Sequence, residues 1–162
     1  DNTAANVLLE ASGGPAALTQ WLRDLGDGTT RLDRNEPSLN TALAGDERDT
    51  TTPQAMLQSL QKLLLGDVLE GYGRALLQQW LVDSRTGDKR LRAGMPGDWK
   101  VGGKTGTGER GTACDTLIVW PTEQSAPLLV TAYLTGSQLD GAGREAVLAR
   151  AGEAVKRWYY AI

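Results

Sequence analysis

Residues 99–108 read WKVGGKTGTG, and the character of the chain changes at this stretch. The residues before it carry helical patterns, whereas two β-rich runs follow it at 112–120 and 127–135. The polar segment 121–127 has the composition of a connecting loop, so we expect the two runs to form adjacent antiparallel strands. A last apolar pattern from Val147 to Tyr159 predicts a final helix. This order predicts an α/β fold in which a helical part packs on an antiparallel sheet with a C-terminal helix.

Four helical patterns precede the glycine-rich stretch. The first covers residues 2–12, and the second runs from Pro15 to a stop at Gly26. Thr52 followed by Pro53 is a typical helix start, and a further apolar stripe lies at residues 76–81. Residues 27–50 show no sustained period, which predicts a long structured loop. Loops of this length inside a compact domain usually carry function.

Composition narrows the chemistry that is open to the chain. The 162 residues carry a net charge of −3, contain no histidine, and have Cys114 as their single cysteine. No basic run is present, so we expect no nucleic-acid partner. No apolar stretch approaches the roughly 20 residues that span a bilayer. We expect no metal, no cofactor and no internal disulfide, and any catalysis must use carboxylate, lysine, hydroxyl or backbone groups.

The sequence around Lys104 invites a phosphate-loop interpretation, which its spacing excludes. A phosphate loop requires glycine where this chain has Asp98, and the stretch precedes a strand where the motif opens a helix. The alternative is an edge strand, residues 104–108, facing a cleft, where Lys104 would bind a substrate carboxylate. An ordinary glycine-rich hairpin with a solvated lysine fits the same residues.

The long loop supplies a second candidate site. Glu36 and Asn40 are four residues apart, so a short helical turn after Pro37 would place both side chains on one side, where they could hold a water molecule. The competing interpretation is an ordinary exposed glutamate. Arg34 and Asp49 could close the neck of the loop through an ion pair, which at a surface would contribute about 0–1 kcal/mol.

Together these motifs resemble the class A serine β-lactamases over essentially the whole chain. Lys104-Thr105-Gly106 resembles the K-T-G element of that family, and Asp1-Asn2 resembles the end of its S-D-N element. Residues 31–53 resemble the family's omega loop and the start of the helix after it. Three matches in one order and spacing are far more specific than any one of them.

The resemblance implies a role for each matched residue. It implies that Glu36 is the general base that, with Asn40, positions the water that hydrolyses an acyl-enzyme, and that the backbone N–H of Thr107 is one of two oxyanion donors. The catalytic residues that it implies are Glu36, Lys104 and Asn2. The substrate-binding residues are Asn2, Asn40, Lys104, Thr105, Gly106, Thr107 and Arg90, with Arg90 replacing an arginine that many members place at Ala113. The supporting residues are Asn6, Arg34, Asp49 and Pro37, which would follow a cis peptide bond.

The serine nucleophile of the family and its lysine would lie before Asp1, because no Ser-x-x-Lys occurs in this chain. We therefore expect this chain to be the C-terminal portion of such an enzyme, without the N-terminal strands and the nucleophile helix. Alone, this portion should be inactive and poorly soluble. Residues 1–82 would form a helical subdomain with the omega loop at about 31–49, and residues 83–162 the C-terminal part of an α/β subdomain.

As a whole, the resemblance implies a periplasmic or secreted hydrolase that confers antibiotic resistance by β-lactam hydrolysis through an acyl-enzyme. Its partners would be a β-lactam substrate and the upstream part of the same protein, and the complete enzyme would be a monomer. The alternatives are a penicillin-binding D,D-peptidase or sensor, or a catalytically inert fragment.

Overall fold

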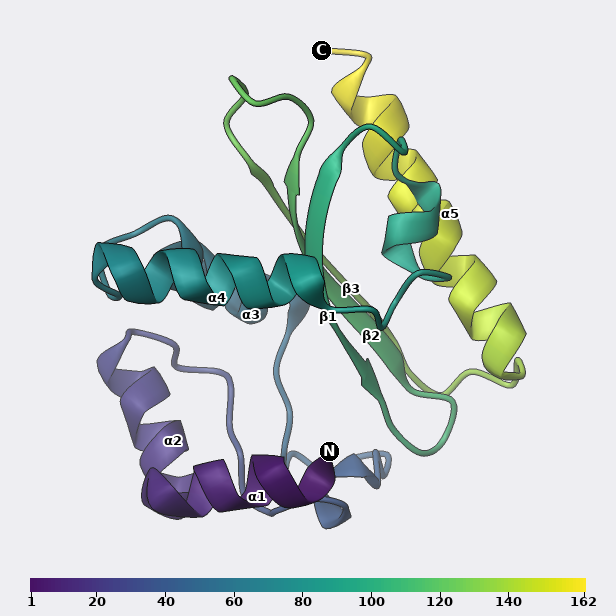
Figure 1. The fold of residues 1–162 in the computed structure, drawn as a ribbon. Coiled ribbons are helices and arrows are strands. Elements are labelled where there is room, and N and C mark those ends of the chain that lie inside the picture. The colour runs from purple at the N-terminus through teal and green to yellow at the C-terminus, as the bar shows by residue number, and fades with distance from the viewer.

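The computed structural model describes all residues from 1 to 162, and it contains helices on both faces of a three-stranded sheet (Figure 1). The α-helices are α1 (Asn2–Ala11), α2 (Gly14–Asp24), α3 (Pro53–Leu64), α4 (Gly71–Asp83) and α5 (Gly141–Tyr159). The 3₁₀ helices are η1 (Ser38–Asn40) and η2 (Leu91–Gly94), and the strands are β1 (Lys100–Thr107), β2 (Ala113–Trp120) and β3 (Leu128–Leu134). The predicted α/β class is confirmed.

The strands form a meander in the order β1-β2-β3, and both pairs are antiparallel. The predicted runs 112–120 and 127–135 are therefore adjacent antiparallel strands. The glycine-rich stretch is the edge strand β1, which begins at Lys100 and ends before Gly108. Lys104 pairs with Thr116 and Thr105 with Asp115, so these two pairs lie on opposite faces of the sheet.

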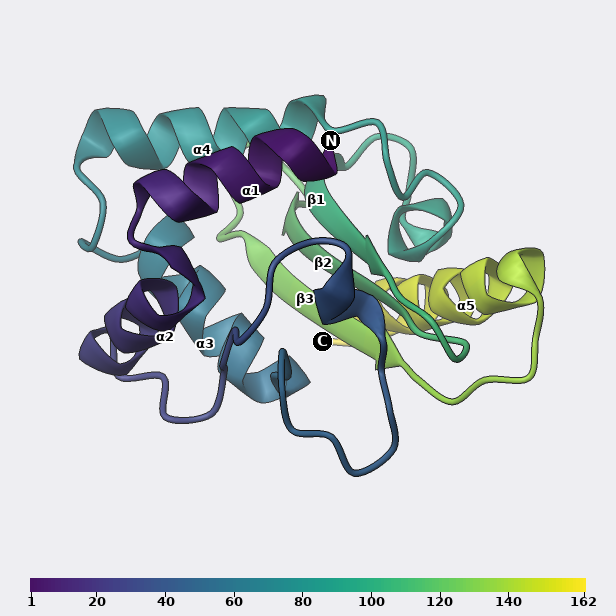
Figure 2. The same cartoon turned by 90° about the horizontal axis from the view of Figure 1, so that it is seen from below.

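Helices cover the two faces of the sheet unequally. Helices α5 and η2 contact each other, and α5 packs on β2 and β3 (Figure 1). Helix α3 packs on β3 and α4 on β1. Helices α1 and α2 contact each other and lie on the same side of the sheet as α3 and α4, near the loop that carries η1 (Figures 1 and 2).

Local chemistry explains where two of these helices begin. The hydroxyl of Thr52 accepts a hydrogen bond from the backbone N–H of Ala55 at 3.1 Å, and Pro53 occupies the first helical position of α3. The carboxylate of Asp140 accepts a bond from the N–H of Gly143 at 2.7 Å at the start of α5. Of the later elements, η2 has no counterpart among the predicted ones, because its short sequence contains no apolar period.

The hydrophobic core lies between the sheet and the layer of η2 and α5. Its buried members are Leu91, Met95, Trp99, Val101, Leu117 and Val119. Only 21 of the 162 residues are buried, and the accessible surface of 9598 Å² exceeds the roughly 7,800 Å² that a compact monomer of this mass exposes. The chain is thus more open than a closed domain of its size. No helix combines the length and apolar character that a bilayer crossing requires.

The packing of η2 against α5 depends on two glycines. A Cβ on Gly152 would lie 2.1 Å from the carbonyl oxygen of Leu91, and one on Gly94 would lie 2.2 Å from the carbonyl oxygen of Ala149. Both atoms belong to backbone that cannot move without shifting a whole helix. The absence of a side chain at both positions therefore allows η2 to pack directly against α5 and cover the core.

We predict that Gly152→Ala lowers the free energy of unfolding by about 1–3 kcal/mol, because the added methyl group overpacks the contact with η2. Urea unfolding followed by tryptophan fluorescence measures this change. Gly141→Ala is the matched control, since it lies on the same helix and a Cβ there meets nothing within 4 Å. Equal stability of the two variants would contradict the packing argument.

Candidate active site

The turn at Glu36 is held from both sides by a single amide side chain. Asn6, on α1, accepts a hydrogen bond from the backbone N–H of Glu36 at 2.9 Å and donates one to its carbonyl oxygen at 2.9 Å. The Glu36–Pro37 peptide bond is cis, and the predicted helical turn after it is η1. The side chain of Asn6 therefore pairs with the backbone of Glu36 as a neighbouring strand would.

The carboxylate of Glu36 is half-buried and faces Asn40. Its Oε2 accepts a hydrogen bond from the Asn40 side-chain amide at 2.5 Å, and the same amide also donates to the carbonyl oxygen of Pro37 at 3.1 Å. Glu36 makes no ion pair, and its Oε1 accepts no hydrogen bond from the protein. A carboxylate with one oxygen restrained and the other open is suited to take a proton from water.

The neck of this loop is closed by Arg34 and Asp49. Oδ1 of Asp49 accepts bonds from the backbone N–H groups of Asp33 at 2.7 Å and Arg34 at 2.9 Å, and Oδ2 accepts one from Arg34 Nε at 2.6 Å. The Asp49 side chain is only 2% exposed. The small stabilisation expected for a surface ion pair therefore does not apply to Arg34 and Asp49. Removing Arg34 would leave the shielded Asp49 carboxylate without its charged partner.

The residues of the K-T-G stretch occupy the C-terminal half of β1. Lys104 is exposed, and its Nζ donates to the carbonyl oxygen of Thr105 at 2.7 Å. Thr107, the last residue of the strand, is also exposed, whereas Thr105 and Gly106 are half-buried. The exposed edge of β1 thus presents an ammonium group and a hydroxyl group a short distance apart along one strand.

Arg90 brings a guanidinium group to the same end of the strand. One of its terminal nitrogens donates to the carbonyl oxygens of Gly106 at 2.7 Å and Cys114 at 2.9 Å, and the other donates to Thr107 Oγ1 at 2.6 Å. Arg90 is 8% exposed and has no carboxylate within ion-pair distance. Its positive charge is therefore not neutralised by direct contact with an acid.

A direct contact joins the loop of Glu36 to the end of β1. The backbone N–H of Glu109 donates to the carbonyl oxygen of Asn40 at 2.8 Å, and a Cβ on Gly108 would lie 3.1 Å from that same oxygen. Arg110 also donates to the carbonyl oxygen of Thr41. These bonds place the loop beside the turn that follows Thr107 (Figure 2).

Asn2 lies at the first position of α1, is exposed, and makes no side-chain hydrogen bond. It precedes Asn6 by four residues, so the two share one face of the helix. This face is the one that holds Glu36. The side chain of Asn2 is consequently free to contact a ligand on the same side of α1.

Cys114 and Tyr133 lie opposite each other on β2 and β3. Burial raises the pKa of the Cys114 thiol above its ordinary value, and burial raises the pKa of Tyr133 to about 12. Both groups are therefore protonated at neutral pH. Neither is activated as a nucleophile, and Cys114 is a free thiol.

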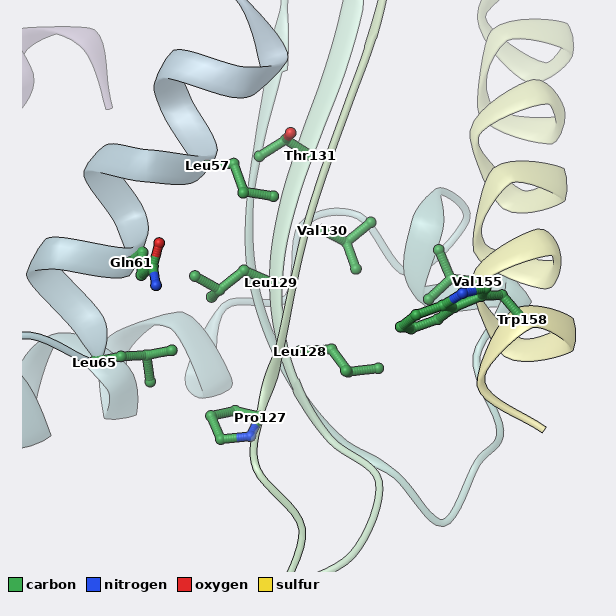
Figure 3. A pocket seen from close by; sticks show the side chains of 10 residues that line it. All are labelled: Leu57, Gln61, Leu65, Pro127, Leu128, Leu129, Val130, Thr131, Val155 and Trp158. Carbon is green, nitrogen blue, oxygen red and sulfur yellow. The ribbon is translucent and has the colours of Figure 1, made fainter. Parts of the chain in front are cut away.

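An apolar cavity lies away from these polar groups. Its volume is about 490 Å³, and it runs along β3 between α3 and α5 (Figure 3). Leu57 and Leu65 line it from α3, and Val155 and Trp158 line it from α5. Its lining contains no titratable group, so it cannot perform acid–base chemistry.

Two features near the polar groups have no counterpart in the sequence analysis. The backbone bond from Glu109 depends on tertiary approach and has no sequence signal. Asp115 is an acid that is 1% exposed on the inner face of β2. The sequence pattern could have singled out Asp115, because this acid interrupts the apolar series Ala113, Leu117 and Val119 on that face.

Fold and geometry together define a relative of the serine enzymes that act on β-lactams. The sequence model of the β-lactamase enzyme family matches residues 1–159, and the chain belongs to that family.

Individual relatives agree with this assignment. The chain is 52% identical to a β-lactamase of Citrobacter koseri over 96% of its own length and 52% of the relative, and 50% identical to β-lactamase OXY-2 of Klebsiella oxytoca over 96% and 53%. A solved class A β-lactamase representing the last common ancestor of Gram-negative bacteria, GNCA4, is 59% identical with a TM-score of 0.96, over 98% of this chain and 60% of that one. The chain spans about half the length of the curated relatives that it matches.

We predict that Asp49→Asn loosens the loop at its neck, because the new amide places donors opposite Arg34 Nε where a carboxylate oxygen had accepted. The cost should be about 1–3 kcal/mol in local stability. Hydrogen exchange measures it, with the amides of Asp33 and Arg34 exchanging faster.

Glu47→Gln is the control for this variant, since Glu47 is exposed in the same loop and its carboxylate makes no bond. If both variants exchange at the rate of the unaltered protein, the neck does not depend on the Asp49 carboxylate.

Proposed function

We propose that this chain supplies the deacylation base and the substrate-binding strand of a class A serine β-lactamase. The observation that carries the proposal is the Glu36–Asn40 pair, docked through the Asn40 carbonyl against the end of β1. A penicillin-binding D,D-peptidase or sensor has no need of such a base beside its strand. Family membership supports the same reaction.

The reaction divides into two halves. The hydroxyl of a serine from a segment carrying Ser-x-x-Lys attacks the β-lactam carbonyl and forms an ester. The carbonyl C–N bond of the four-membered ring breaks, and the nitrogen takes up the proton that the hydroxyl loses. Glu36 then takes a proton from a water molecule held with Asn40, and the water oxygen attacks the ester carbonyl. The tetrahedral oxyanion accepts a hydrogen bond from the N–H of Thr107, and its collapse returns the serine with its proton.

The substrate carboxylate is bound at the edge of β1 in this proposal. Lys104 supplies a positive charge, the hydroxyl groups of Thr105 and Thr107 donate hydrogen bonds, and Gly106 leaves room for the ligand. Arg90 adds a second charge next to Thr107. Asn2 binds the amide side chain of the substrate from α1. Asn6, Arg34, Pro37 and Asp49 support the loop.

The upstream part of the protein is the proposed partner of this chain. The free edge of β3, the apolar cavity beside it and the excess surface of roughly 1,800 Å² support a missing covering layer. Three exposed apolar side chains also support a missing covering layer, since Val7, Leu8 and Trp80 are each more than 60% accessible. In the complete protein, residues 1–82 would form a helical subdomain with its omega loop at 31–49, and residues 83–162 part of the α/β subdomain.

The compartment and assembly follow from the proposed activity. Because β-lactams reach their targets outside the cytoplasmic membrane, we place the complete enzyme in the periplasm or among secreted proteins. We propose that it acts as a monomer without metal or cofactor, since every group named above comes from one chain.

We predict that Glu36→Gln, in the enzyme completed by its Ser-x-x-Lys segment, slows deacylation by about 10²–10⁴-fold, because the amide cannot take the proton from water. Intact-mass analysis after mixing with a penicillin should detect a persistent acyl-enzyme. Glu47→Gln, an exposed carboxylate of the same loop, should turn over normally. Unchanged turnover by Glu36→Gln would refute the base assignment, and absence of any acylation in the unaltered enzyme would refute the hydrolase.

We also predict that Arg90→Ala raises KM for carboxylate-bearing β-lactams about 10- to 100-fold, the loss expected for a charged hydrogen bond, with a smaller change in kcat. Steady-state kinetics measure both constants. Arg85→Ala is the matched control, because Arg85 is exposed in the same segment and makes no hydrogen bond or ion pair. Unchanged constants for Arg90→Ala would remove Arg90 from the binding site.

A further inference from the structure

Asp115 is a buried carboxylate that the proposed reaction leaves unused. It is the third residue of β2, lies opposite Thr105 and faces the layer of η2. Its neighbours on the same face of the strand, Ala113 and Leu117, are buried and apolar. Placing an acid in such surroundings is costly unless its oxygens have specific partners.

The partners of Asp115 lie in the segment that carries Arg90. Its Oδ2 accepts a hydrogen bond from the backbone N–H of Leu91 at 3.1 Å. Burial raises the pKa of Asp115 to about 6, against the lowering effects of the Leu91 N–H and of the charges on Arg90 and Arg92. The group is therefore a carboxylate at neutral pH and remains a hydrogen-bond acceptor.

The other end of the same segment has no room for a side chain beside Thr105 and Asp115. Gly87 has a φ of +91°, and a Cβ there would lie 2.8 Å from Thr105 Cγ2 and 3.6 Å from Oδ2 of Asp115. The backbone N–H of Arg90 then bonds to the carbonyl oxygen of Gly87 at 2.9 Å. The turn from Gly87 to Leu91 is thus bonded to the Asp115 carboxylate at Leu91, and its other end lies close to the same carboxylate.

This turn sets where the Arg90 guanidinium lies. Arg90 has the backbone angles φ −105° and ψ −137°, outside the helical region that η2 adopts directly afterwards. Its side chain reaches across to Gly106, Cys114 and Thr107 from that fixed origin. No carboxylate forms an ion pair with Arg90, so Asp115 holds the backbone of this turn without direct contact with the guanidinium group.

We propose that Asp115 is a positioning residue for Arg90, which holds the turn 87–91 so that the guanidinium is presented beside Thr107 to the carboxylate of a β-lactam. This inference rests on the proposed function of the site. It extends substrate selection to a buried side chain that never touches substrate.

The test compares two substrates in the completed enzyme, a penicillin and its methyl ester, which lacks the charged carboxylate. Asp115→Ala should lower the preference for the acid, measured as the ratio of the two kcat/KM values, by about three- to tenfold, as expected for one lost hydrogen bond. The change should appear in KM for the acid. Asp115→Asn keeps an oxygen that can accept from Leu91, so it should retain the preference to within about threefold.

A double variant separates positioning from general damage. In the Arg90→Ala background, Asp115→Ala should not alter the preference further, because the two residues act through one group. An equal loss of rate on both substrates by Asp115→Ala, or an additive effect in the double variant, would overturn the proposal. If the unaltered enzyme hydrolyses neither substrate, the proposed function itself fails, and that result is distinct from a retained preference in Asp115→Ala.

Discussion

The contact between the carbonyl oxygen of Asn40 and the turn after β1 is the constraint on which the polar site depends. The Glu109 N–H meets this oxygen at 2.8 Å, and the absence of a side chain at Gly108 lets the two backbones approach. Arg110 of the same turn also donates to the Thr41 carbonyl oxygen, and the other bonds of the loop are internal or run to the helices. The contacts with this turn therefore transfer the rigidity of the sheet to the segment carrying Glu36.

The loop is itself rigid because its polar groups are satisfied by specific partners. Asp49 accepts three bonds at its neck, and Asn6 pairs with the Glu36 backbone in both directions. Hydrogen bonds to charged groups contribute about 1.5–3 kcal/mol, more than the neutral average, so the acids at the neck fix the loop strongly. Such restraint keeps Glu36 oriented while leaving Oε1 open.

The sequence predicted those parts of the fold that rest on local chemistry. The start of α3 at Thr52 and Pro53 and the two strands around residues 121–127 follow from capping and period, and the structure confirms them. The glycines of β1 concealed a full strand, because glycine carries little intrinsic strand preference and pairing with β2 overrides it. The sequence did not predict helix η2, because this helix depends on the close approach of Gly94 to Gly152. The two glycines are 58 residues apart, so no local pattern reveals the contact.

The site residues also fall into two groups, those that local sequence could predict and those that depend on tertiary contact. Glu36 and Asn40 could be paired from a spacing of four residues, whereas the edge strand at Lys104 was one of two interpretations of its glycine-rich sequence. Only the family resemblance named Arg90 as a binding residue, and its bond to Thr107 could not be predicted, because the two residues are 17 positions apart. Asp115 broke the apolar alternation of its strand, yet what it serves appears only when the turn from Gly87 to Leu91 is seen to be bonded to it at Leu91.

The two faces of the β1–β2 pair carry different residues, and Asp115 lies on the face that packs on the core. Lys104 and Thr116 share one face of the β1–β2 pair, while Thr105 and Asp115 share the other. The core on that second face is apolar and could have continued to the strand end with a leucine, at less cost than a buried acid. The acid instead holds a turn whose arginine donates to Gly106 and Thr107 at the end of β1. Stability of the core and charge at the strand end are thereby coupled through one side chain.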